Sequence, residues 1–301
     1  MSAKSSLVVW VAIGANVGIA VVKFVAAAVT GSSALLSEGI HSVVDTGNEA
    51  LLLVGLARSD RPPDAGHPFG HGRELYFWSL IVAVLLFGVG GGMAIYEGIT
   101  HLRAPRPIED TVWAYAVLAV AALFEGISWT IALRDLLRQR RGRTLWTTIR
   151  ASRDPSVFTV LFEDSAALIG LAAAFLGVWI GERTGDPRAD GVASIVIGSV
   201  LCITALLLVR ETKSLLVGEA ASRPLLASIE AVAREDARVA DVPRLRTMVL
   251  GRHQILLALD VRFRDGLAAQ ALIDAVREVA GTIRARHPDV RDVLLQPVGR
   301  A

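Results

Sequence analysis

Long apolar runs fill the first two thirds of the chain, and a shorter alternating pattern follows them. A hydrocarbon core about 30 Å thick needs roughly 20 apolar residues in a helix, so each long run predicts a membrane span. The runs lie at Leu7–Val29, Ser33–Leu56, Tyr76–Leu102, Val112–Leu133, Phe158–Ile180 and Ala189–Val209. The pattern therefore predicts an all-α membrane bundle of six transmembrane helices over residues 1–210.

The last part of the chain, residues 211–301, has the pattern of a small water-exposed domain. Helices are expected at Arg223–Glu235 and Leu267–Arg286, and strands at Arg244–Leu250, Gln254–Phe263 and Val293–Val298. The middle strand alternates apolar and polar residues with a period of two, as a half-buried strand does. The order helix–strand–strand–helix–strand is typical of a two-layer α+β, ferredoxin-like module.

Composition agrees with a membrane protein and excludes several other classes. The 301 residues are 53% hydrophobic and 20% charged, and the mean hydropathy is +0.50. These values argue against a wholly soluble enzyme, a disordered chain and a fibrous protein. The net charge of +2 indicates no nucleic-acid partner. The single cysteine, Cys202, cannot build a disulfide framework or a cysteine zinc site within one chain.

The connections between spans differ in their content of basic residues, which sets the orientation in the membrane. One set holds 11 basic residues: Lys4, Arg58, Arg61, Arg73, Arg134, Arg138, Arg140, Arg141, Arg143, Arg150 and Arg153. The opposite set holds four: Arg103, Arg106, Arg183 and Arg188. We therefore expect both termini and the tail in the cytoplasm, in a multi-pass protein of the cell (inner) membrane.

The second span carries a stripe of polar residues. Glu38, His41, Asp45 and Asn48 follow one another at offsets of 3, 4 and 3, which places them on one helical face. Ionisable groups inside a bilayer are costly and normally face the bundle interior or a water-filled cavity. His41 and Asp45, one turn apart, could grip a divalent cation. The alternative is a structural hydrogen-bond network between helices.

The fifth span supplies two more acidic residues, Glu163 and Asp164. Adjacent residues point about 100° apart on a helix, so both need not reach one ligand. Together with His41 and Asp45 they would give a tetrahedral site of nitrogen and oxygen ligands. Zn²⁺ accepts such ligands, and Mn²⁺ and Fe²⁺ also tolerate carboxylate-rich sites. Binding requires neutral histidine and ionised aspartate, so an arriving metal would displace protons.

The loop between the second and third spans places Asp64, His67 and His71 within eight residues, among prolines and glycines. Such a cluster could hold a second metal ion. The alternative is a structured turn whose histidines bond to the backbone.

Other polar and small residues in the spans are interpreted as packing features. Glu97 and Glu125 mark helix contacts or water access, and His101 ends the third span as an interfacial residue. The glycines of Gly88–Gly92 predict a close approach between helices.

These motifs resemble the cation diffusion facilitator family of divalent-metal/proton antiporters over nearly the whole chain. The resemblance is carried by Ser37–Asp45, His67–Gly72 and Asp186–Ser194. It implies that the His41–Asp45 pair belongs to a transport site and that the loop matches a second, interfacial zinc site. The stretch Phe162–Ser165 resembles the branch of zinc transporter 9-like proteins.

The chain departs from the family pattern in two places. The family commonly has histidine or aspartate four residues before the aspartate of its fifth span, and here that position is Val160. Glu163 is the candidate replacement. The last predicted strand carries no metal ligand at Leu294–Val298. The tail is therefore expected to serve dimerisation rather than metal sensing.

The resemblance and the motifs together predict a transporter and not an enzyme. We expect a homodimer that exports a divalent cation, Zn²⁺ before Mn²⁺, Fe²⁺ or Co²⁺, in exchange for H⁺, without a prosthetic group. The leading alternative is a non-transporting membrane scaffold or regulator that keeps the fold. A metal-dependent hydrolase would need a helical histidine pair around a glutamate or a serine–histidine constellation, and the sequence has neither.

Overall fold

The computed structural model describes residues 3–139 and 155–299, which form two compact units. The first unit is drawn from Met1–Gly55 and Phe77–Thr212, and the second from Leu56–Tyr76 and Lys213–Ala301. The loop that follows the second predicted span therefore belongs to the same unit as the tail. Five of the orientation arginines, Arg140, Arg141, Arg143, Arg150 and Arg153, lie outside the described residues.

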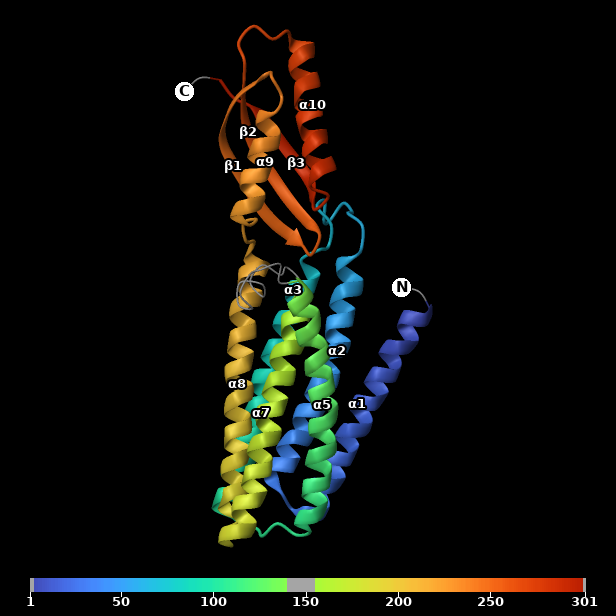
Figure 1. Cartoon of the computed structure of the whole chain (residues 1–301), viewed down its shortest axis with the longest axis vertical. Coiled ribbons are helices and arrows are strands. Elements are labelled where there is room, and N and C mark those ends of the chain that lie inside the picture. The colour runs from blue at the N-terminus through green and yellow to red at the C-terminus, as the bar shows by residue number, and fades with distance from the viewer. Residues whose placement is uncertain (1–2, 140–154, 300–301) are drawn as a thin grey trace. The chain divides into compact units, whose positions relative to one another are not determined.

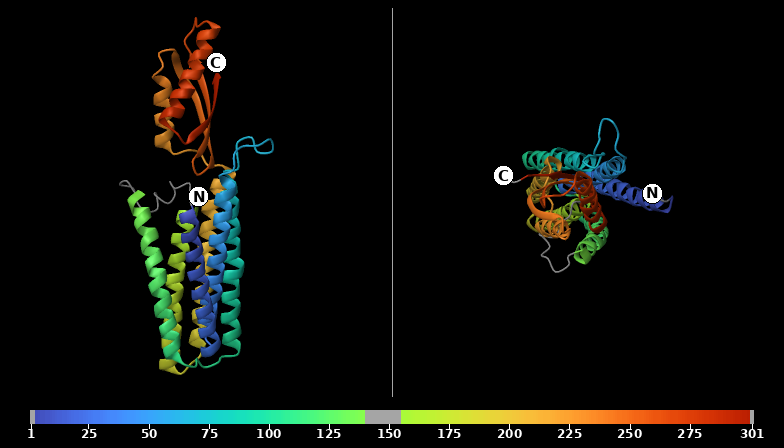
Figure 2. Two further views of the ribbon diagram at one scale, coloured as in Figure 1. Left: turned by 90° about the vertical axis from the view of Figure 1, so that its right-hand side faces the viewer. Right: turned by 90° about the horizontal axis from the view of Figure 1, so that it is seen from above.

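Long helices run side by side through the first unit (Figures 1 and 2). A π-helical segment, η1, joins α3 and α4 into one continuous helical run. The bounds are α1 Ala3–Thr30, α2 Ser33–Ser59, α3 Glu74–Leu85, η1 Leu86–Gly92, α4 Met93–Arg103, α5 Thr111–Gln139, α7 Pro155–Thr184 and α8 Arg188–Val217.

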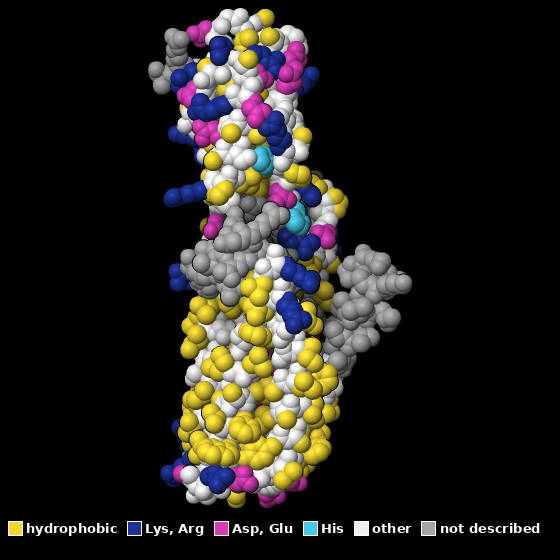
Figure 3. All heavy atoms as spheres, viewed as in Figure 1, with side chains coloured by type: hydrophobic (Ala, Val, Ile, Leu, Met, Phe, Trp, Pro, Cys, Tyr) yellow, Lys and Arg dark blue, Asp and Glu magenta, His cyan; other side chains and the backbone are white. Residues whose placement is uncertain are grey.

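The surface of these helices is apolar, as a membrane protein requires. Hydrophobic side chains cover most of the helical unit between its ends in the view of Figure 3. Leu123 and Ile131 on α5 are each 63% exposed, which is costly in water and favourable in lipid. Four helical segments within the described residues are long and apolar enough to cross a membrane: Glu74–Arg103, Thr111–Arg138, Phe158–Thr184 and Arg188–Val217.

The two remaining predicted spans correspond to α1 and α2. The apolar stretch described in α1 is shorter, Asn16–Thr30. Helix α2 is 27 residues long and carries three acidic residues, Glu38, Asp45 and Glu49. Its polar side chains point inward, since Glu38 and Asn48 are fully buried. The fold-class prediction of a helical membrane bundle with a small α+β tail is confirmed.

Glycines bring the third and sixth predicted spans into close contact. A Cβ atom on Gly98 would lie 2.6 Å from the carbonyl oxygen of Gly191, and one on Gly198 would lie 2.6 Å from that of Gly91. Both distances are too short for a side chain, so these helices pack backbone to backbone. The glycine-rich stretch that predicts a close helix approach thus contributes Gly91, whereas a Cβ on Gly88 would meet open space.

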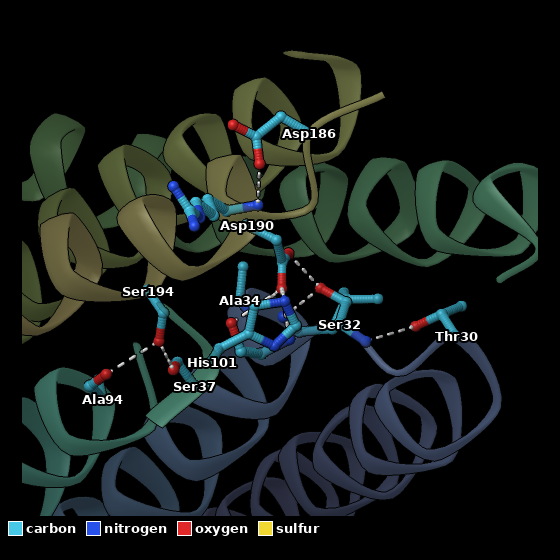
Figure 4. Close-up of polar contacts among 12 residues, drawn as sticks. Thr30, Ser32, Ala34, Ser37, Ala94, His101, Asp186, Asp190 and Ser194 are labelled. Atoms are coloured by element: carbon cyan, nitrogen blue, oxygen red, sulfur yellow. Dashed lines mark hydrogen bonds and ion pairs between the residues drawn. The ribbon is translucent and has the colours of Figure 1, made fainter. Parts of the chain in front are cut away.

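Asp190, at the start of α8, caps the N-terminus of α2 (Figure 4). Its Oδ1 accepts a hydrogen bond from Ser32 Oγ at 2.6 Å, and its Oδ2 accepts from the amide and hydroxyl groups of Ser33 at 2.5 and 2.8 Å. A carboxylate suits this position because the first amide groups of a helix lack partners and the helix dipole is positive there. His101 is also buried, with Nε2 4.0 Å from Asp190 Oδ2.

Ser194 extends this contact along α8 by one helical turn (Figure 4). Its hydroxyl donates to the carbonyl oxygen of Ala94 at 2.9 Å and is hydrogen-bonded to the hydroxyl of Ser37. Helices α2, α4 and α8 are thus joined at one end of the bundle by buried polar groups.

The tail folds as α9 Arg223–Arg234, β1 Val239–Gly251, β2 Gln254–Phe263, α10 Ala269–Arg286 and β3 Val290–Pro297. The sheet order is β1-β2-β3, with β1 antiparallel and β3 parallel to β2. Helix α9 packs on β1, α10 packs on β3, and the helices contact each other, so both cover one face. Ile255, Leu257, Leu259 and Val261 of β2 form the centre of the core beneath them.

The first strand begins at Val239, five residues before the predicted start at Arg244. Its pairing with β2 shifts register between Val239 and Asp241 and again between Asp241 and Arg244. Pro243, which has no amide hydrogen, lies in this irregular part. The apolar positions there do not keep the period of two, which explains why the alternation rule misses them.

Candidate functional site

Four helices of the first unit enclose a cavity of about 320 Å³. Carboxylates reach it from three of these helices, and small hydroxyl or amide side chains lie between them. The lining consists of Asn16 and Ile19 from α1, Ser42, Asp45 and Glu49 from α2, Phe124, Glu125, Ile127, Ser128 and Ile131 from α5, and Val160, Glu163 and Asp164 from α7.

The predicted pair on α2 is close together at this cavity. His41 Nδ1 lies 3.3 Å from Asp45 Oδ1, as expected for residues one turn apart. Asp45 lines the cavity, whereas His41 is not among the lining residues and is only 1% exposed. Neither ring nitrogen of His41 is hydrogen-bonded, and neither is Asp45 Oδ1. Buried polar atoms normally have a hydrogen-bond partner, so these atoms are available to a ligand.

Both acidic residues of the fifth predicted span reach the same cavity. Glu163 Oε1 accepts a hydrogen bond from Asn48 Nδ2 on α2 at 2.7 Å. Asp164 Oδ2 accepts one from Ser128 Oγ on α5 at 2.8 Å. Helix α7 therefore sends two adjacent carboxylates toward two different neighbours, and the cavity lies where the helices meet. Val160, one turn earlier, lines the cavity with an apolar side chain.

The four predicted ligands do not form a closed metal site in this conformation. No three of His41, Asp45, Glu163 and Asp164 bring their ligand atoms within 4.8 Å of one another. Within residues 3–139 and 155–299, only Asp64, His67 and His71 do so. Asp45, Glu163 and Asp164 therefore share a cavity, with His41 next to Asp45, but their ligand atoms do not converge on one point.

A buried ion pair beside the site is absent from the sequence-based candidates. Lys23 Nζ of α1 lies 3.1 Å from Glu38 Oε2 and donates a hydrogen bond to Ser42 Oγ at 2.8 Å. Both charged side chains are almost completely buried, Lys23 at 1% and Glu38 at 0% exposed. The sequence does carry a signal for this pair, because a lysine in the middle of an apolar span needs a partner.

A second contact ties α1 to α2 at the cavity. Asn16 Nδ2 lies 3.1 Å from both carboxylate oxygens of Glu49. With the Lys23–Glu38 pair, it fixes the position of α1 against α2 on either side of Asp45.

In the second unit, the loop residues Asp64, His67 and His71 each bring one potential ligand atom within 4.8 Å of the others. His71 Nε2 lies 2.9 Å from Asp64 Oδ2, and His67 Nδ1 lies 3.5 Å from Asp64 Oδ1. The hydrogen bond to His71, followed by the one from the His67 amide, lowers the pKa of Asp64 to about 2. Asp64 is therefore ionised at every physiological pH, as a metal ligand must be.

This loop packs against the turn between β1 and β2. A Cβ on Gly72 would lie 2.6 Å from the carbonyl oxygen of Leu250, so only glycine fits there. Gln254 Nε2 donates to the carbonyl oxygen of Phe69 at 2.7 Å and to Asp292 Oδ2 at 3.1 Å. The end of β1 and the start of β2 thus contact the loop on either side of His71.

We expect His71→Ala to weaken Zn²⁺ binding by the loop about tenfold or more, because it removes one ligand and the partner of Asp64. Calorimetry in an Asp45→Asn, Asp164→Asn background would isolate the loop from the membrane cavity, and His253→Ala in the tail is the matched control. Binding should also weaken in acid, since imidazole binds metal only when neutral and Asp64 stays ionised. Equal affinities for the His71 and His253 variants would exclude a loop site.

Comparison with known proteins identifies a matching family model and several relatives that are metal transporters by name. The family model of the cation efflux transmembrane domain matches residues 9–217. The chain is 32% identical over 254 residues to the proton-coupled zinc antiporter SLC30A9, mitochondrial, of Xenopus laevis, which covers 84% of this chain and 45% of that protein. It is 32% identical over 241 residues to metal tolerance protein C4 of Arabidopsis thaliana, covering 79% of this chain and 53% of the relative.

A bacterial relative matches over most of its length. The manganese efflux system protein MneP of Bacillus subtilis is 25% identical over 272 residues, 88% of this chain and 86% of the relative. In contrast, the chain spans about half the length of the zinc antiporter and of the plant protein.

Proposed function

The chain belongs to the cation diffusion facilitator family, whose members are transporters and not enzymes, and on this premise we propose that it exports a divalent metal cation in exchange for protons. The observation that carries the proposal is the cavity among α1, α2, α5 and α7, into which Asp45, Glu163 and Asp164 project. Burying charged carboxylates inside a membrane bundle costs free energy, and a bound cation would compensate their charge during transport.

We propose that His41, Asp45, Glu163 and Asp164 are the ligands that bind the cation during transport. In the conformation described the ligand atoms of these groups do not converge on one point, so binding would require their side chains or the helices that carry them to move. Rocking of helices around a fixed site would then expose it alternately to the two sides of the membrane. Coupling to protons follows when one state prefers the cation and the other prefers protons, since each ligand shifts the states only by its differential affinity.

Zn²⁺ is the first candidate cargo, because one imidazole and several carboxylates suit it and because zinc antiporters are among the relatives. Mn²⁺ is the second, because the site is rich in oxygen and a manganese efflux protein is also a relative. Fe²⁺ and Co²⁺ accept the same donors. We also propose that the protein lies in the cell (inner) membrane with both termini in the cytoplasm, an orientation supported by the basic connections.

We also propose that the protein acts as a homodimer joined through its tail. Met248 on β1 and Leu294 on β3 expose large apolar side chains on the three-stranded sheet, at 38% and 55%. Exposed apolar groups on a small domain favour association.

A non-transporting scaffold is the second candidate function. Val160 favours it, because this residue lines the cavity with a side chain that cannot bind metal. The two functions differ in one measurable property, metal-dependent flux.

Flux in proteoliposomes tests the proposed function. We expect the wild-type protein to move Zn²⁺ or Mn²⁺ when a pH gradient is imposed, and to move much less when the gradient is collapsed by an ionophore. Zn²⁺, Mn²⁺, Fe²⁺ and Co²⁺ would be compared at equal concentration, with protein-free vesicles as the control. Vesicles that stay tight to all four metals at every pH gradient would favour the scaffold.

A further inference from the structure

Five carboxylates line the membrane cavity, and four of them lie beside a polar side chain. Each of the four has a donor or an imidazole within 3.3 Å, supplied by a different side chain. The pairs are Asp45 with His41, Glu49 with Asn16, Glu163 with Asn48, and Asp164 with Ser128. Hydrogen bonds hold Glu49, Glu163 and Asp164 in place before any cation arrives, whereas Asp45 lies beside the His41 ring with no hydrogen bond to its Oδ1.

Glu125 of α5 is the fifth carboxylate, and it differs from the others. It lines the same cavity and is partly buried. Within the part of the chain that the structure describes, its carboxylate makes no hydrogen bond and no ion pair. A carboxylate in this setting carries a desolvation cost, and within the described residues no hydrogen bond or ion pair offsets it.

The surroundings of Glu125 point to a cation as the missing partner. Ser128, one turn along α5, already donates its hydroxyl to Asp164, which places the Glu125 face of α5 toward the carboxylates of α7. Carboxylates that share one cavity repel each other. A divalent cation bound among them attracts each carboxylate and so offsets this repulsion. A flexible glutamate with free oxygens is suited to follow such a cation.

We infer that Glu125 is an additional cation-binding residue of the transport cavity, supplied by a helix outside the predicted α2–α7 ligand set. This inference rests on the proposed function and deepens it. A further oxygen ligand shifts the site toward cations that prefer oxygen donors, and Mn²⁺ depends on such donors more than Zn²⁺ does. Glu125 therefore contributes to the choice of metal and compensates for Val160, which offers no ligand.

Replacing Glu125 by glutamine tests this role, because the shape is kept and the charge is removed. We expect Glu125→Gln to lower the affinity for Mn²⁺ about tenfold or more and the affinity for Zn²⁺ less, so that the Zn²⁺/Mn²⁺ preference rises. Calorimetry on the purified full chain with MnCl₂ and ZnCl₂ gives both affinities, and proteoliposome flux gives the matching transport preference.

Glu97→Gln is the matched control, because Glu97 is also a half-buried carboxylate in an apolar helix but does not line the cavity. A structural role would lower the thermal stability of the Glu125 variant and leave the metal preference unchanged. If Glu125→Gln does not fold, Glu125→Asp replaces it. That variant keeps the charge on a shorter side chain, and we expect weaker Mn²⁺ binding in a folded protein.

The outcomes separate this inference from the proposed function. Glu97→Gln should keep the wild-type Zn²⁺/Mn²⁺ preference. If the wild-type protein transports metal and the Glu125 variants also keep this preference, the inference is overturned and the proposed function stands. If wild-type protein neither binds nor transports any metal, the proposed function fails, and the inference fails with it.

Discussion

Replacing Asp45 and Asp164 together by asparagine should reduce metal flux by about 100-fold or more, to the level of protein-free vesicles. The two residues lie on α2 and α7 and line the same cavity, so the double variant removes a negatively charged ligand from each wall. Asparagine keeps the size of the side chain. The loss would therefore report on charge and ligation rather than on packing.

The measurement is Zn²⁺ and Mn²⁺ uptake into proteoliposomes with an imposed pH gradient, alongside calorimetry in detergent. Glu97→Gln is the control for the removal of a membrane carboxylate that does not line the cavity, and it should retain most of the flux. A double variant that transports metal at the wild-type rate would reject the assignment of the site to α2 and α7.

Replacing Lys23 alone by methionine should destabilise the protein by about 3–5 kcal/mol, because Glu38 would keep its charge without a buried partner. Glu38 is fully buried, and only Lys23 is ion-paired with it among the described residues. Replacing both residues by methionine removes both charges. That double variant should be close to wild type in stability or more stable, since a buried ion pair recovers little more than its desolvation cost.

A double-mutant cycle of thermal or denaturant unfolding in detergent would measure this effect. The expected result is a strongly destabilised Lys23→Met variant whose loss is recovered by adding Glu38→Met. If the double variant is as unstable as the single one, the packing of the lysine stem on its neighbours, and not its charge, stabilises the contact between α1 and α2.

Helical periodicity accounts for what the sequence could predict about the site. Spacing alone places His41 and Asp45 one turn apart, and in the structure His41 Nδ1 lies 3.3 Å from Asp45 Oδ1. Spacing likewise brings Asp64, His67 and His71 together, because a short loop leaves them little freedom. Such relations depend only on neighbours along the chain, so local geometry suffices to predict them.

Other features depend on which helices become neighbours, and one sequence does not contain that information. Glu163 and Asp164 point about 100° apart, and both reach the cavity because α2 and α5 flank α7 and supply Asn48 and Ser128. The Lys23–Glu38 pair likewise requires α1 to lie against α2 at one particular height. Glu125, interpreted from the sequence as a packing residue, lines the cavity because α5 faces α7.

The backbone contacts between Gly91 and Gly198, and between Gly98 and Gly191, have a mechanical consequence. Two helices this close have no side-chain layer between them that could slide or repack, so the continuous run of η1 and α4 is expected to move with α8 as a single rigid body. The cavity has no lining residue from either helix. Opening and closing it would therefore leave this rigid body as a static frame, against which the cavity-forming helices shift.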